Sequence, residues 1–93
     1  FVGAFELLLS TVVDRPKIEE VFQTGRGVGW HEHDEMMFCG CERFFRSGYF
    51  AHLVADWLPA LEGGTERLEA GARVADVGCG HGASTIIMAE AFP

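Results

Sequence analysis

A glycine-rich stretch near the carboxyl end of the chain constrains the fold more than any other feature. Residues 72–85 read Ala-Arg-Val-Ala-Asp-Val-Gly-Cys-Gly-His-Gly-Ala-Ser-Thr. The residues before Gly78 are mostly small or β-branched, which is typical of a parallel strand covered on both faces. The alternating glycines that follow allow a sharp turn, because glycine adopts positive φ cheaply and lets a ligand approach bare backbone. The stretch therefore predicts a strand at 74–77, a turn, and a helix over 83–91.

The same letters fit two cofactor motifs. Gly78, Gly80 and Ala83 match the G-x-G-x-x-A form of the dinucleotide fingerprint. Asp76 and the three glycines, the last of them Gly82, match the D-x-G-x-G-x-G pattern of class I S-adenosylmethionine-dependent methyltransferases. A carboxylate at the end of the strand would repel a pyrophosphate, but it would attract the ammonium and sulfonium groups of S-adenosylmethionine. Asp76 therefore favours S-adenosylmethionine, and a turn that binds no ligand is the structural alternative.

A resemblance to one bacterial methyltransferase family, with common actinobacterial examples, extends over three blocks: 27–34, 44–49 and 71–85. Members of that family carry a winged-helix-like N-terminal domain before the methyltransferase domain. The glycine motif is specific for the superfamily, and the two upstream blocks are specific for the family. The resemblance implies an α/β fold: a mainly helical N-terminal or linker region over 1–70, followed at 71–93 by the first β-α unit of a Rossmann-like class I methyltransferase domain, here incomplete.

The resemblance also implies a function, namely methyl transfer from S-adenosylmethionine to a small-molecule acceptor by direct displacement. The chain would be the N-terminal part of the enzyme and inactive alone, because an acid for the ribose hydroxyls belongs about 20 residues after the turn, beyond Pro93. No catalytic residue is assigned. The alternatives are an NAD(P)- or flavin-dependent oxidoreductase and a regulator that binds a ligand without catalysis. The residues implied in cofactor binding are Asp76, Gly78, Cys79, Gly80, Gly82 and Tyr49, the last of which is also explained as a core aromatic.

The composition of the chain excludes some classes of binding partner. The chain has 93 residues, seven of them Lys or Arg, and a net charge of −7, which argues against a nucleic-acid surface with clustered basic side chains. No apolar run is long enough for a transmembrane helix. Three cysteines without a disulfide framework suit a reducing compartment. We therefore expect a cytoplasmic protein with a small-molecule substrate and no nucleic-acid or membrane partner; a homodimer is left open.

Hydrophobic spacing predicts a mainly helical chain before the motif. Breaks are expected at 14–16, where Asp-Arg-Pro stops one helix and starts another, and at 47–48, where Ser-Gly occurs. Gly25 and Gly71 are expected to close helices in the left-handed conformation. Asp34 and Thr65 are expected to cap helix starts. The predicted helices cover residues 1–13, 17–24, 35–45, 49–58 (ended by Pro59), 66–70 and 83–91, the last with Ile86, Ile87, Ala89 and Ala91 available for burial.

Two histidines and two cysteines invite a metal hypothesis. His31-x-His33 and Cys39-x-Cys41 both contain zinc-ligand types. Neither pair has the spacing of a zinc finger or ribbon, and residues two apart on a helix point in different directions. No metal site is therefore predicted. A role in a substrate pocket, a capping role and a purely structural role stay open for the histidine-rich loop.

Overall fold

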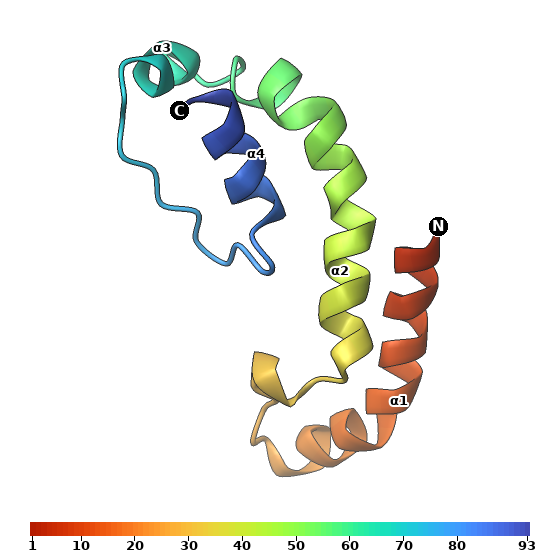
Figure 1. Ribbon diagram of the computed structural model, residues 1–93. Coiled ribbons are helices and arrows are strands. Elements are labelled where there is room, and N and C mark those ends of the chain that lie inside the picture. The colour runs from red at the N-terminus through yellow and green to blue at the C-terminus, as the bar shows by residue number, and fades with distance from the viewer. The chain divides into compact units, whose positions relative to one another are not determined.

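The computed structural model describes all residues from Phe1 to Pro93, and the chain divides into two compact units, Phe1–Phe44 and Phe45–Pro93. The predicted domain boundary between residues 70 and 71 stays a prediction. No helix combines the length and apolar character needed to cross a membrane. In chain order the elements are α1 (Val2–Thr24), the 3-10 turn η1 (Trp30–Glu32), α2 (Glu35–Gly48), the π-helix η2 (Tyr49–Trp57), α3 (Gly64–Glu69) and α4 (Ala83–Ala91) (Figure 1).

The predicted α/β fold is wrong, because the structure is 69% helical and contains no strand. Residues 72–76, which include most of the expected strand, form an irregular segment, and Val77 is 94% exposed. A strand is held by hydrogen bonds to a neighbouring strand, and isolated strands are not stable in water. No second strand is present to pair with this one, so the apolar sequence remains irregular. The helix predicted after the turn is confirmed as α4.

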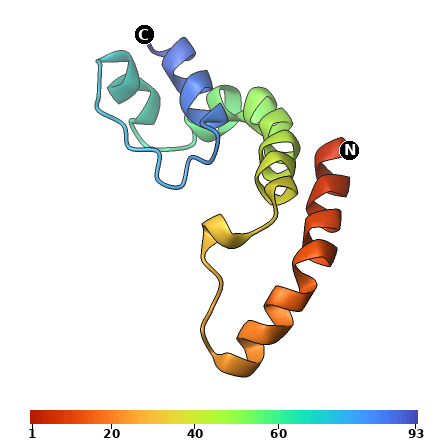
Figure 2. The same cartoon turned by 60° about the horizontal axis from the view of Figure 1, so that its bottom comes forward.

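In the first unit, α1 and α2 pack closely at two buried glycines. A Cβ atom added to Gly3 would lie 2.6 Å from the backbone nitrogen of Phe44, and one added to Gly40 would lie 2.9 Å from that of Leu7. Figures 1 and 2 show the two helices side by side in both views. An ion pair between Glu6 and Arg43 also joins them. The close approach of the backbones therefore depends on the absence of side chains at positions 3 and 40.

The predicted break at residues 14–16 is wrong, because α1 runs through Pro16 as one helix. Proline lacks the N–H that would bond to the carbonyl four residues earlier, and its ring crowds that carbonyl, so a helix bends at proline without always ending. Figure 1 shows this bend in α1. The predicted end of the helix is confirmed: Gly25 has φ 71°, and its N–H donates to the Val21 carbonyl at 2.8 Å.

The start of α2 is confirmed and its predicted end is wrong. The Asp34 side chain accepts a hydrogen bond from the Met36 N–H at 2.9 Å, as a capping residue does. Gly48 has helical dihedral angles, φ −67° and ψ −42°, and η2 follows at once. In η2 the Leu58 N–H donates to the Leu53 carbonyl at 2.9 Å, the five-residue spacing of a π-helix. Regular helix ends just before Pro59, as predicted.

In the second unit, α4 packs against η2. Of the four α4 residues expected to be available for burial, Ile87 is buried, and Ile86, Ala89 and Ala91 are exposed. Thr65 lies inside α3 rather than before it, so its predicted capping role is wrong.

The end of α3 is as predicted. Gly71 has φ 85°, and its N–H donates to the Leu68 carbonyl at 3.0 Å. This left-handed turn directs the chain into the irregular segment that leads to α4.

Candidate functional site

Asp76 is held at the start of α4 by two hydroxyl groups. Thr85 Oγ1 and Ser84 Oγ donate to Asp76 Oδ2 at 2.6 and 2.7 Å. Chiefly the Thr85 bond, and then the Ser84 bond, hold the pKa of Asp76 below its ordinary value of 3.8. The carboxyl group is therefore ionised at neutral pH. Its second oxygen, Oδ1, makes no hydrogen bond within the chain and is free to accept one from a ligand.

The turn after Asp76 exposes a row of backbone donors. Gly78, Gly80 and Gly82 all have positive φ, at 73°, 56° and 81°. A Cβ atom added to any of them would meet nothing within 4 Å. The Gly82 N–H donates to the Cys79 carbonyl at 2.9 Å, and the Cys79 N–H closes a turn over residues 77–78, whereas the N–H groups of Gly78, Gly80 and His81 make no hydrogen bond within the chain. Free N–H groups in a turn of this kind bind carboxylate and phosphate oxygens.

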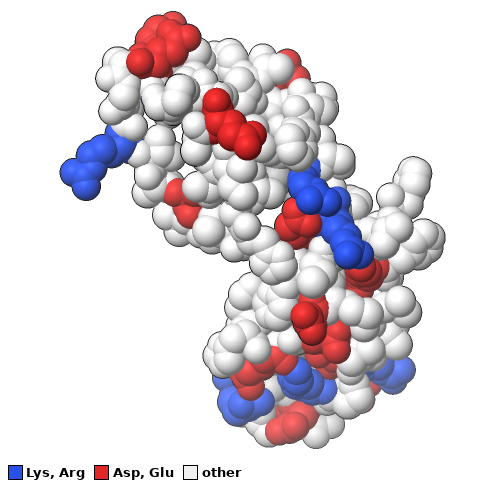
Figure 3. Space-filling model, in the orientation of Figure 1, with Lys and Arg blue, Asp and Glu red and all other residues white.

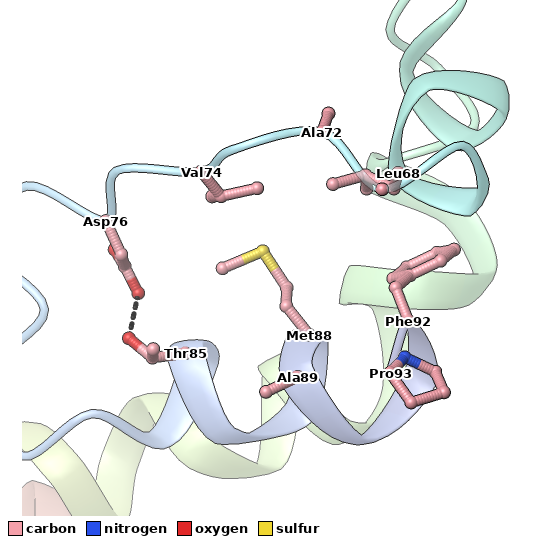
Figure 4. Close-up of a pocket in the computed structure, with 10 residues that line it drawn as sticks. Leu68, Ala72, Val74, Asp76, Thr85, Met88, Ala89, Phe92 and Pro93 are labelled. Carbon is pink, nitrogen blue, oxygen red and sulfur yellow. Dashed lines mark hydrogen bonds between the residues drawn. The ribbon is translucent and has the colours of Figure 1, made fainter.

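A cavity of about 330 Å³ lies between the irregular segment and α4, with Asp76 in its lining. Figure 4 shows Met88 extending from α4 toward Val74, while the Asp76–Thr85 hydrogen bond lies at one side. The volume of the cavity is at the small end of the range for ligand pockets, which are mainly apolar with a few polar groups. The lining residues are Leu68, Gly71, Ala72, Val74, Asp76, Thr85, Met88, Ala89, Phe92 and Pro93.

The other residues implied in cofactor binding lie elsewhere. Gly78, Cys79, Gly80 and Gly82 form the turn next to Asp76, but they do not line the cavity. Tyr49 lies on η2 in a group of aromatic rings, with centroid distances of 6.4 Å to Phe45 and 6.1 Å to Trp57. The structure does not place Tyr49 in the cavity lining, and the binding roles of all these residues stay predictions.

Sequence reasoning missed Ser84 and Thr85. Both hydroxyl groups lie in the first turn of α4, eight and nine residues after the acid that they bond. The signal was present, because α4 was predicted to begin at residue 83. A carboxylate that leads into a tight turn can reach hydroxyl groups in the first turn of the helix that follows.

A second cluster, in the first unit, surrounds the buried carboxylate of Asp14, which is 4% exposed. The Asp34 N–H donates to both carboxylate oxygens at 3.2 and 3.1 Å, and His33 Nδ1 lies 2.8 Å from Oδ2. Lys17 Nζ lies 3.3 Å from Oδ1. The Asp34 N–H first, then His33 and Lys17, hold the pKa of Asp14 below its ordinary value. Nothing in the sequence pattern indicated this contact.

The metal hypothesis gains no support from this arrangement. His33 is bonded to Asp14 on α1, while His31 is exposed. No group of three or more His, Cys, Asp or Glu side chains is placed to hold a metal ion. The three cysteines, Cys39, Cys41 and Cys79, are free thiols.

Basic side chains in the first unit are paired with acids rather than gathered. On the face shown in Figure 3, blue and red side chains are interspersed over this unit. This arrangement differs from the clustered Lys and Arg of a phosphate-binding surface. The pairs are Arg15–Glu19, Lys17–Asp14, Arg26–Glu32 and Arg43–Glu6.

Comparisons with protein families, with curated proteins and with solved structures found no match for this chain.

Proposed function

We propose that this chain binds S-adenosylmethionine through residues 76–85 and acts in methyl transfer to a small-molecule acceptor. The observation that carries the proposal is the ionised carboxylate of Asp76, with one oxygen free, beside the free N–H groups of Gly78, Gly80 and His81. The amino-acid part of S-adenosylmethionine carries an ammonium and a carboxylate. Asp76 Oδ1 would accept from the ammonium, and the backbone N–H groups would donate to the carboxylate, both as charge-assisted hydrogen bonds.

The surroundings of Asp76 fit such a ligand. The three glycines have open space where side chains would otherwise stand, so a ligand can reach the backbone. The hydroxyl groups of Ser84 and Thr85 fix the carboxylate in one orientation. The adjoining cavity, with Val74 and Met88 in its lining, offers apolar surface to the uncharged parts of the cofactor.

The charge at Asp76 favours S-adenosylmethionine over a dinucleotide. A pyrophosphate on the same N–H groups would bring two negative charges close to an ionised carboxylate, and this repulsion costs binding energy. An ammonium at that position would be attracted to the carboxylate instead, and this attraction strengthens binding.

The three free thiols agree with the proposed cytoplasmic location of the protein.

The chain contributes binding and orientation to the reaction. When bound, S-adenosylmethionine supplies an electrophilic methyl carbon on a sulfonium, and an acceptor lone pair forms the new bond to this carbon as the carbon–sulfur bond breaks. Asp76 and the turn would hold the amino-acid end in one position. Fixing one reactant in this way lowers the entropic part of the barrier to displacement.

Calorimetry on the intact protein tests the proposal. We expect S-adenosylmethionine and S-adenosylhomocysteine to bind, and NADH to bind more weakly. Asp76→Asn should weaken S-adenosylmethionine binding by about 10- to 150-fold, because a hydrogen bond to a charged group contributes about 1.5–3 kcal/mol. Asp56→Asn is the matched control: Asp56 is an exposed acid of the same unit, paired with His52, and its loss should leave binding unchanged.

Two results would reject the proposal. Tighter binding of NADH than of S-adenosylmethionine would favour the oxidoreductase alternative. Equal binding by the parent and Asp76→Asn would mean that the carboxylate does not contact the ligand.

A further inference from the structure

The first half of α1 is apolar on the side of the helix that faces away from α2. The side that faces α2 and the loop before it is buried or half-buried, and it consists of Gly3, Leu7, Ser10 and Asp14. Because an α-helix has about 3.6 residues per turn, the residues between these positions lie on the opposite side. They form the outer face of α1, which consists of Val2, Phe5, Leu8, Leu9, Val12 and Val13. Each of these residues is between 52% and 68% exposed.

The outer face carries no charge and no polar side chain. The one charged residue of this part of α1, Glu6, lies beside the contact with α2 and is paired with Arg43. A helix that is apolar on opposite sides is usually buried on both of them, yet no part of the first unit covers the outer face. A lipid surface is disfavoured as the partner, because helices that bind one carry Lys and Arg, whereas this chain has a net charge of −7.

The spacing of the outer face indicates that its partner is a helix. Apolar residues recur at intervals of three, four and three positions, at Val2, Phe5, Leu9 and Val12. This is the spacing with which one helix packs lengthwise along another. A second copy of α1 has the same spacing, so two outer faces can meet across a two-fold axis.

The charges that follow the outer face favour one orientation of the two copies. Glu19 and Glu20 lie on the same side of α1, beyond Pro16, and both are exposed. Parallel copies would bring these acids side by side, where like charges repel, whereas antiparallel copies place them at opposite ends.

We propose that two copies of the chain pair through the outer faces of α1 as antiparallel helices, with Phe5 of each copy against Leu9 of the other. In this register Val2 of each copy lies against Val12 of the other. Six side chains that each expose on the order of 100 Å² supply about 600 Å² from each copy, or about 1,200 Å² in all, which is the lower limit for a stable specific interface. The dimer is therefore reversible and depends on concentration. The pairing does not depend on S-adenosylmethionine binding at Asp76.

Sedimentation of the intact chain and two charge variants tests the pairing. Phe5→Glu and Leu9→Lys should each be monomeric alone, because the new charge faces an apolar residue of the other copy. An equimolar mixture should recover the dimer, since the new carboxylate then faces the new ammonium, and the other Phe5–Leu9 contact stays apolar. Gln23→Lys, an exposed change on α1 outside the outer face, should dimerise like the parent.

Three results would overturn the proposal: a parent chain that stays monomeric at millimolar concentration, a mixture as dissociated as each folded variant alone, or either variant dimerising like the parent. Circular dichroism confirms that each variant keeps its helices.

NMR on a mixture of isotope-labelled and unlabelled parent chain reports the orientation directly, and it decides alone if a variant does not fold. We expect contacts between copies from Val2 to Val12 and from Phe5 to Leu9. Contacts of each residue with its own counterpart, or contacts that leave out α1, would contradict the antiparallel pair.

Discussion

At the scale of single residues, a substitution at Gly80 tests whether the glycine turn contacts a ligand. An added Cβ at Gly80 meets nothing within 4 Å, but its φ of 56° is unfavourable for a β-branched residue. We expect Gly80→Val to cost about 1–2 kcal/mol of stability through this strain. It should also abolish S-adenosylmethionine binding, because the side chain fills the space where ligand and backbone would meet. Calorimetry measures binding and urea denaturation measures stability. Retained binding in the folded variant would show that the turn does not contact the cofactor.

Asp14 gives a prediction about pH. Its pKa is lower in the folded chain than its ordinary value of 3.8, so the folded state binds this proton less tightly than the unfolded state. The stabilisation is thus complete above about pH 4 and is lost as the pH falls through the folded pKa. We expect Asp14→Asn to destabilise the chain at about pH 7 and the difference from the parent to shrink toward about pH 3. Urea denaturation across this range measures it, and a difference that is independent of pH would contradict the prediction.

At the scale of the helix, two glycines of α2 form a matched pair. Gly40 faces α1, and a Cβ there would lie 2.9 Å from the Leu7 backbone nitrogen. Gly48 has a helical φ of −67°, and a Cβ atom added there would meet nothing within 4 Å. Gly40→Ala should therefore destabilise the chain by about 1–3 kcal/mol through overpacking. Gly48→Ala should stabilise it by up to about 1 kcal/mol through helix propensity. Thermal unfolding compares them, and equal effects of the two substitutions would mean that the contact between α1 and α2 does not form.

Local signals were readable from the sequence, and signals that depend on distant partners were not. Gly25 and Asp34 act on the backbone within four residues of themselves, and both were predicted correctly. The predicted strand at 74–77 does not form, because strand pairing requires a second strand. The predicted break at Ser47-Gly48 does not occur, because α2 continues directly into η2, where no tight turn requires the conformational freedom of glycine.

In the candidate sites, too, the sequence indicated contacts between neighbouring residues but not contacts between distant ones. Asp76 and the glycine turn lie within one short stretch, so the residues could be selected from their spacing. The cavity residues Leu68 and Phe92 come from outside that stretch, and sequence reasoning did not find them. The contact between Asp14 and His33 spans 19 positions and depends on the packing of the loop against α1, which no local pattern reports.

At the scale of the whole chain, apolar burial is small. Val21 and Ile87, one in each unit, are the buried large apolar side chains, at 8% and 9% exposure. Burying such a side chain contributes about 1.5–3 kcal/mol, whereas ordering one backbone residue costs about 1–2 kcal/mol. Meanwhile one helix, α1, exposes a long apolar surface. Its members are Val2, Phe5, Leu8, Leu9, Val12, Val13 and Phe22.

Because few large apolar side chains are buried and α1 exposes many, we predict that residues 1–93 associate through α1 when no other partner is present. An exposed apolar surface of this kind favours contact with a second surface, and a second copy of the chain supplies one. We expect sedimentation to show association that rises with concentration, together with binding of a hydrophobic dye. Placing charge on the surface with Phe5→Glu and Val12→Glu should reduce both signals. Gln23→Glu, which adds one negative charge at an exposed polar position of α1, should not. A monomer that unfolds sharply, at a midpoint independent of concentration and without dye binding, would show that the half-buried side chains suffice to stabilise the chain.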